Sequence, residues 1–186
     1  MRVLKWIIII LVALVLLFQF VAKPYLKEQT KKHSPQITES FESDQLQLEV
    51  SYSSPFKKGR VIFGELVPYD VVWRTGANEP TTFSTESDIS VKGNSLAAGT
   101  YSLWTKPGRE NWTVYFNSEI PDWGVTISSG GRETTRNPQY DVLVIEVPVI
   151  ELQQTEESFT IDFSEEEMVY MNLYWDTTKI RVPITP

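Results

Sequence analysis

The sequence holds one histidine, His33, and no cysteine, and these two facts limit its chemistry more than any motif does. His33 precedes the region expected to fold, so a Ser-His-Asp triad cannot assemble in that region. The lack of cysteine excludes thiolate nucleophiles, disulfides and Cys-ligated zinc, and one histidine cannot form a His-based metal cluster. The sequence therefore predicts no catalytic residue of these classes, no metal site and no cofactor.

Carboxylates are the remaining route to acid–base catalysis, since the chain has 24 acidic residues. Most of them lie in loops or where the solvent-exposed face of a strand is expected, as at Glu49, Glu146 and Asp162. The sequence has neither the spacing of a calcium-binding loop nor that of a phosphate-binding P-loop. A carboxylate-based hydrolase is therefore the least favoured of three hypotheses.

The densest cluster of polar and aromatic residues is the segment 59–82, GRVIFGELVPYDVVWRTGANEPTT. Its candidate ligand-binding residues are Arg60, Trp73, Arg74, Asn78 and Glu79. Forked guanidinium donors, an amide and a carboxylate beside a flat ring suit a sugar or another small polar ligand. The structural alternative is that Arg74 and Glu79 pair with each other and hold an irregular connection whose backbone groups need partners.

A second candidate is the segment 128–136, SSGGRETTR. Its Gly-Gly backbone and its two arginines, Arg132 and Arg136, would suit an anion. The favoured interpretation of this segment is nevertheless a mobile loop.

The elements that must position these residues are strands, because apolar and polar side chains alternate from Gln45 onward. Residues 100–105 and 112–116 flank the turn sequence KPGREN and are expected to pair as an antiparallel hairpin. Residues 141–147 are almost continuously apolar, which is typical of a strand covered on both faces. The pattern predicts an all-β domain over residues 45–186, an antiparallel β-sandwich of about seven to nine strands.

Residues 1–23 are expected to form an N-terminal transmembrane helix that acts as a signal-anchor. The apolar run 6–22 would be about 25 Å long as a helix, against a hydrocarbon core of about 30 Å. Lys5 and Lys23 can snorkel toward the headgroups and cover the difference. The alternative is a cleaved secretory signal, but the apolar run exceeds the usual length of about 7–15 residues, and Phe20 stands where cleavage needs a small side chain. We expect one membrane pass, with lipid contacts made by residues 6–22.

Residues 24–44 are polar, contain two prolines and lack a sustained apolar period, which predicts a polar tether. The region after the tether is acidic. It holds eleven of the 17 basic and twenty of the 24 acidic residues, so its own formal charge is −9. The residues before it are net positive, which brings the formal charge of the whole chain to −7. A phosphate backbone would be repelled by such a domain, which disfavours nucleic acid as a partner.

Several stretches resemble a known family: VIFGELVPYDVVWRTGANEPTTF, LAAGTYSLWTKPGRENWTVYFN, DWG, FTIDF and LYWDTTKIRVPI. They are similar to the domain of unknown function family 2911, common in Bacteroidota, over residues 51–184. The resemblance implies a secreted or envelope-attached β-rich domain and no established activity. It also implies a set of motif positions, which are Arg60, Gly64, Trp73, Arg74, Gly76, Asn78, Glu79 and Trp123.

Relatives in this family typically begin with a cleavable signal, so an uncleaved anchor is a departure, and the resemblance favours a domain on the periplasmic or exterior side. The leading hypothesis is a membrane-anchored, non-enzymatic envelope protein that binds a small polar or carbohydrate ligand near Trp73, Arg74, Asn78, Glu79 and Trp123. The alternative is a structural or protein-interaction scaffold of the envelope, in which the motif only braces the fold.

Overall fold

The computed structural model describes residues 2–126 and 128–186; Met1 and Ile127 lie outside the described residues. The chain divides into two compact units, Met1–His33 and Ser34–Pro186.

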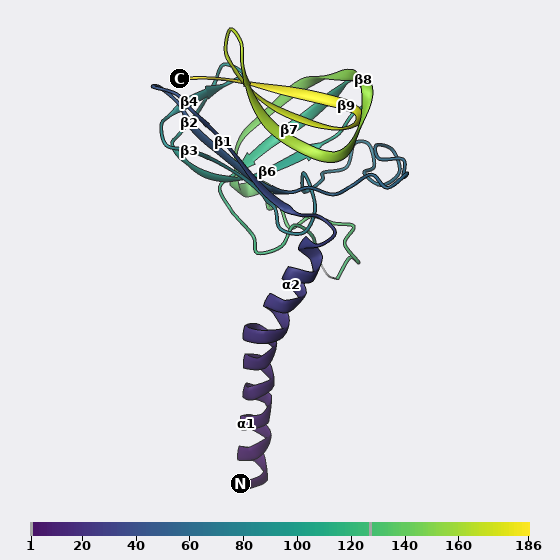
Figure 1. The fold of residues 1–186 in the computed structure, drawn as a ribbon. Helices are drawn as coiled ribbons and strands as arrows, with labels where there is room; N and C mark the ends of the chain where they lie inside the picture. The colour runs from purple at the N-terminus through teal and green to yellow at the C-terminus, as the bar shows by residue number, and fades with distance from the viewer. Residues whose placement is uncertain (1, 127) are drawn as a thin grey trace. The chain divides into compact units, whose positions relative to one another are not determined.

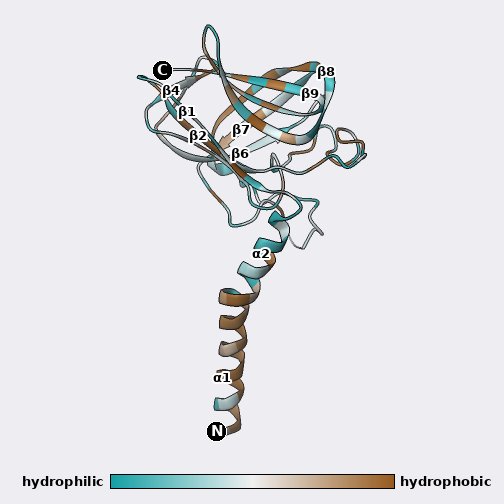
Figure 2. Cartoon of the chain, in the orientation of Figure 1, coloured by the Kyte–Doolittle hydropathy of each residue, from teal (hydrophilic) through white to brown (hydrophobic). Residues whose placement is uncertain are grey.

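The first unit is helical. It consists of α1 (Arg2–Leu17), the π-helical turn η1 (Phe18–Ala22) and α2 (Lys23–Lys31). Pro24 at the start of α2 has no N–H to donate, and just before it the hydrogen bonding changes register, with the Lys23 N–H donating to the Phe18 carbonyl. The apolar side chains of α1 are exposed all around the helix, which is mostly brown in Figure 2. The stretch Val3–Lys31 is long and apolar enough to cross a membrane, although a signal sequence would pass the same test.

The described residues of the second unit form nine strands, which confirms the predicted all-β, antiparallel fold class (Figure 1). Every pairing between these strands is antiparallel, and the order in the sheet is β1-β2-β3-β6-β7-β8-β9-β4-β5. One short 3₁₀ turn, η2 (Pro138–Tyr140), precedes β8. The strands are β1 (Gln36–Glu42), β2 (Gln47–Ser53), β3 (Thr81–Thr85), β4 (Ile89–Val91), β5 (Asn94–Leu96), β6 (Gly99–Lys106), β7 (Asn111–Asn117), β8 (Asp141–Glu165) and β9 (Val169–Thr185).

Strand β8 joins the two layers of this unit because its two halves have different partners. Its first half pairs with β7 as far as Pro148, and its second half pairs with β9 from Val149 onward. The second half also packs against the start of the sheet, where the rings of Phe41 in β1 and Phe163 in β8 lie 6.3 Å apart. Two layers facing each other across a common apolar core form a sandwich.

The expected tether, residues 24–44, has regular structure instead. Helix α2 continues to Lys31, and β1 pairs with β2 along its whole length, so the β unit begins at Ser34 rather than at Gln45. Strand β1 is an edge strand whose only partly buried apolar side chains are Ile37 and Phe41. Glu39 interrupts the apolar alternation between them, and the strand therefore looks like a polar linker in the sequence.

Two local expectations had different outcomes. The hairpin is confirmed, because β6 and β7 pair antiparallel from Ser102 opposite Asn117 to Lys106 opposite Thr113. The two-sided cover expected for residues 141–147 is wrong: Val142 and Val144 are each 49% exposed, whereas the alternate side chains of the strand are buried. Valine on the open face of a sheet gives the same apolar run as a strand buried on both sides.

Candidate functional site

The signature segment, residues 73–79 with the sequence WRTGANE, is fastened to two strands by its backbone. Trp73 exchanges both backbone hydrogen bonds with Thr105 of β6, with N···O distances of 2.6 and 3.1 Å. The Ala77 N–H donates to the Ser53 carbonyl at the end of β2, at 3.3 Å. The segment is therefore held at the ends of β2 and β6 immediately before it enters β3.

The Trp73 side chain belongs to the core and is only 9% exposed. Its ring stacks on Trp175, with 6.1 Å between centroids and 16° between planes, and meets Phe159 edge-on at 4.9 Å. These rings belong to one group, the aromatic cluster, made of Phe63, Trp73, Trp112, Phe159 and Trp175. Trp73 was expected to offer its ring to a ligand, but in the structure the ring is buried against the other rings of the aromatic cluster.

The middle of the signature segment has an unusual backbone conformation. Thr75 has φ = +58°, which is rare for a β-branched residue, and its buried hydroxyl lies 3.0 Å from the Thr105 hydroxyl. Gly76 has φ = +136°, and a Cβ placed on it would lie 2.7 Å from the Ser53 carbonyl oxygen. Glycine is thus required at position 76 both by conformation and by space.

Arg74 lies next to this backbone but has no partner of its own. Among the described residues, no hydrogen bond or ion pair engages its guanidinium, and Nε is buried. Burial lowers the pKa of Arg74, and no neighbouring carboxylate counteracts that effect. The ion pair between Arg74 and Glu79 that the structural alternative needs is therefore not formed within the described chain. A buried donor left unsatisfied costs roughly 1–3 kcal/mol, and more when it is charged.

Asn78 is the second residue of the segment with an unsatisfied donor. Its φ of +58° is a conformation that asparagine tolerates better than most residues. Its backbone carbonyl accepts a hydrogen bond from the Gly124 N–H at 3.0 Å, while its side-chain Nδ2 is buried and has no partner in the described part of the chain. Glu79, which follows, is partly buried.

Gly124 brings the second motif, DWG, against the signature segment. A Cβ on Gly124 would lie 2.6 Å from Cδ of Arg74 and 3.0 Å from the carbonyl oxygen of Asn78. The flanking chain is fixed by Thr135, whose hydroxyl donates to the Trp123 carbonyl at 2.5 Å and whose N–H donates to the Gly124 carbonyl at 3.3 Å. Arg74, Asn78 and Gly124 therefore form one compact group, here named the Arg74–Asn78 site, with the partly buried Trp123 next to it in the chain.

Arg60 is not part of this group. It is exposed, its Nε donates to the Lys57 carbonyl at 2.9 Å, and its Nη2 donates to the Phe56 carbonyl. No hydrogen bond links Arg60 with the signature segment in residues 2–126 and 128–186. Its guanidinium braces the turn that precedes it.

In the segment 128–136, one of the two arginines makes contacts within the fold. Arg136 forms an ion pair with Asp141, and its guanidinium lies 4.0 Å above the centre of the Tyr115 ring. Asp141 also accepts from the Asn117 amide at 2.8 Å. Of the two arginines considered for an anion, only Arg132 is exposed.

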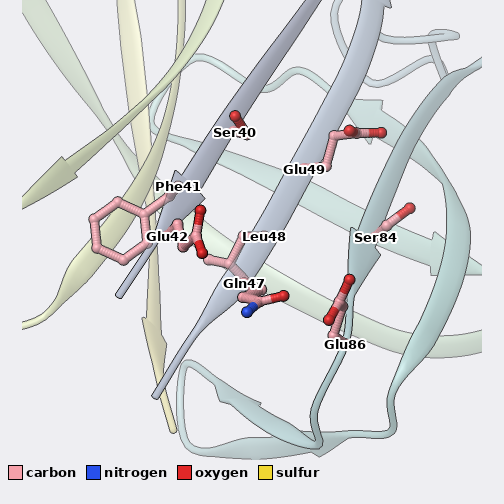
Figure 3. Close-up of a pocket in the computed structure, with 8 residues that line it drawn as sticks. All are labelled: Ser40, Phe41, Glu42, Gln47, Leu48, Glu49, Ser84 and Glu86. Carbon is pink, nitrogen blue, oxygen red and sulfur yellow. The ribbon is translucent and has the colours of Figure 1, made fainter. Parts of the chain in front are cut away.

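A shallow groove of about 280 Å³ lies across the ends of β1, β2 and β3, and Figure 3 shows the residues that line it. It contains three carboxylates, from Glu42, Glu49 and Glu86, all of them exposed. No hydrogen bond joins these carboxylates in the part of the chain that the structure describes, so the groove offers no hydrogen-bonded acid pair. The described residues also contain no group of three or more side chains that could hold a metal ion.

The family model described as protein of unknown function, DUF2911, matches residues 34–184. The chain belongs to this family. The DUF2911 match begins where the β unit begins, so β1, which was expected to be tether, is part of the family domain. It also contains the whole Arg74–Asn78 site. Comparisons with curated proteins and with solved structures found no match.

Some residues of the site could not be identified from sequence alone. The steric role of Gly124 was hidden, although the tripeptide DWG that contains it was recognised as a family motif. Thr75, Thr81 and Thr105, whose hydroxyls hold the strained backbone, are inconspicuous in a sequence rich in threonine. Their only signal is that they flank the segment on neighbouring strands, which requires knowledge of the strand pairing.

Proposed function

We propose that this DUF2911 protein is a membrane-anchored, non-enzymatic protein of the cell envelope that binds a small polar or carbohydrate ligand at the Arg74–Asn78 site. The observation that carries the proposal is the Nε of the partly buried Arg74, a buried N–H donor that has no acceptor among the described residues. A protein that keeps such a group loses stability unless something else accepts its hydrogen bonds.

The anchor in this proposal is the apolar helix, with residues 6–22 in contact with lipid. Its exposed apolar side chains on all sides are what a single helix surrounded by hydrocarbon would present. The resemblance to envelope-attached relatives favours a periplasmic or exterior position for the domain. Protease protection of the domain in sealed, right-side-out spheroplasts, whose periplasmic face is open to protease, would contradict that orientation.

The ligand-binding part is tested with the full-length protein in a neutral detergent. Neutral sugars, zwitterionic amino acids and small organic acids are screened by thermal shift, where a ligand at 100 times its Kd adds about 2.7 kcal/mol to the free energy of unfolding. The shift should be lost in Arg74→Gln and retained in Arg132→Gln, which removes the same charge from an exposed position. A shift that persists in Arg74→Gln would place the ligand elsewhere.

The scaffold alternative has one observation in its favour. Trp73, Thr75 and Gly76 all make contacts that the fold needs, so part of the signature segment is structural whatever Arg74 does. The two functions differ at Arg74 itself. A pure scaffold gives this side chain a bracing role, and replacing it would then destabilise the protein without any ligand present.

A further inference from the structure

The unsatisfied side-chain groups of Arg74 and Asn78 have the same hydrogen-bonding character. Arg74 Nε and Asn78 Nδ2 are both N–H donors, and both are buried. A ligand that satisfies them must present acceptor atoms. A neutral sugar hydroxyl satisfies a donor, but it also brings donors of its own that would need acceptors in the site.

The charge of Arg74 narrows the choice further. A guanidinium stays protonated in proteins and here has no carboxylate partner among the described residues. Hydrogen bonds between a guanidinium and an oxyanion are charge-assisted and roughly twice as strong as neutral ones, and the planar fork matches a carboxylate or a phosphate. A neutral ligand would leave this partly buried charge uncompensated.

The surroundings limit the size of the anion. The domain carries an excess of acidic residues, so an extended polyanion would be repelled over most of the surface. The positions of Arg74 and Asn78 are also fixed, because Gly124 packs directly on the Arg74 side chain and bonds to the Asn78 backbone. A fixed pair of donors in an acidic domain suits one charged group rather than a chain of them.

We infer that the Arg74–Asn78 site binds a small molecule through a single oxyanion group, a carboxylate or a phosphate. This inference rests on the proposed function and names the chemical class of its ligand. Arg74 supplies the charge and one donor, and Asn78 supplies a second donor, its buried Nδ2.

The test uses full-length protein in neutral detergent and three probes: sodium acetate, sodium phosphate and glucose, with sodium chloride at matched ionic strength as reference. Acetate or phosphate should raise the melting temperature saturably, while chloride and glucose should not. Acetate and phosphate are compared with each other to decide between a carboxylate and a phosphate. The response should disappear in Arg74→Gln and persist in Arg132→Gln.

Asn78→Gly is the second variant, because glycine keeps the positive φ and removes only the amide. It should weaken the anion response about tenfold, the effect of losing one charge-assisted hydrogen bond. Anion stabilisation of equal size in Arg74→Gln would overturn the inference. So would a glucose response that depends on Arg74 without any anion response, although the proposed function would survive. A wild-type protein that responds to none of the three probes and to nothing in the wider screen would contradict both.

Discussion

Trp73 and Arg74 are adjacent in the chain, yet they belong to two regions with opposite properties. In the aromatic cluster, Trp73 meets four other rings at centroid distances between 4.9 and 6.4 Å. In the Arg74–Asn78 site, the backbone is fixed just as firmly, but two buried donors have no acceptor in residues 2–126 and 128–186. The same seven residues thus contain a ring that packs against other rings and two donors that have no acceptor among the described residues.

This difference in contacts suggests that, within one motif, some residues are needed for stability and others for function. A family motif can be retained because it holds the fold together, and the aromatic cluster accounts for Trp73 in that way. The fold gains nothing from a buried donor that it leaves unsatisfied, so the fold alone does not account for Arg74 and Asn78. Residues that lower stability without serving the fold are found at functional sites.

The largest expected effect lies on the core side of the comparison. Trp73→Ala removes a ring that packs against the rest of the aromatic cluster, and should lower the free energy of unfolding by about 3–5 kcal/mol. Urea unfolding followed by tryptophan fluorescence measures this loss. A loss below 1 kcal/mol would mean that Trp73 is not a core residue, and the contrast with Arg74 would disappear.

Gly124→Ala acts on the contact between the two motifs and should have an intermediate effect. The new methyl group would collide with Cδ of Arg74 and approach the Asn78 carbonyl, which should lower the free energy of unfolding by about 1–3 kcal/mol and abolish the anion response. Adding Arg74→Ala removes the first collision and should recover part of the stability, but not the response. Strictly additive losses in the double variant would show that Gly124 and Arg74 do not touch.

A third polar group, around Tyr174, sharpens the comparison because its donors, the Tyr174 hydroxyl and the Asn172 Nδ2, both have acceptors, although the Asn172 Oδ1 has none among the described residues. The Tyr174 hydroxyl donates to Asp162 at 2.7 Å, and Asp162 also accepts from Asn172 at 2.8 Å. Burial, together with the hydrogen bond to Asp162 and the charge of that residue, raises the pKa of Tyr174 above its ordinary value of 10.0.

Because the folded state holds this proton more tightly than the unfolded state, its contribution to stability is complete below about pH 10 and is lost as the pH rises beyond that value. Melting temperatures between pH 8 and pH 11 should therefore fall at the alkaline end, and Tyr174→Phe should reduce that fall while costing about 1 kcal/mol at neutral pH. Some slope should remain, since burial raises the pKa of Tyr52 as well. An unchanged slope in Tyr174→Phe would assign the alkaline loss to other groups.

The sequence predicted the parts of the fold in which one face of a strand is strictly apolar. Leu48, Val50 and Tyr52 alternate with polar residues and are all buried in β2. Strand β1 was missed because an edge strand needs few apolar contacts and its Glu39 breaks the alternation. Val144 was expected to be buried because the sequence alone does not distinguish an apolar side chain on a solvent-exposed face from one on a buried face.

The candidate site was predicted less completely than the fold. Arg74, Asn78 and Trp123 do lie on two segments that meet, as the family motifs suggested. Trp73 and Arg60 have surroundings that the sequence could not indicate, because aromatic and cationic side chains serve a core, a turn or a ligand equally well. The absence of a partner for Arg74 could be recognised only from the positions of all described acceptors around it.

The measurement that tests the central claim most directly is the free energy of unfolding of Arg74→Met in the absence of added anions. Methionine keeps much of the side-chain volume and removes the unsatisfied charge, so we expect the variant to be more stable than the wild type by about 1 kcal/mol. Arg132→Met, which removes the same charge from an exposed side chain, serves as the matched control and should change stability by no more than about 0.5 kcal/mol. A loss of 2 kcal/mol or more in Arg74→Met would show that Arg74 braces the fold and would contradict the account.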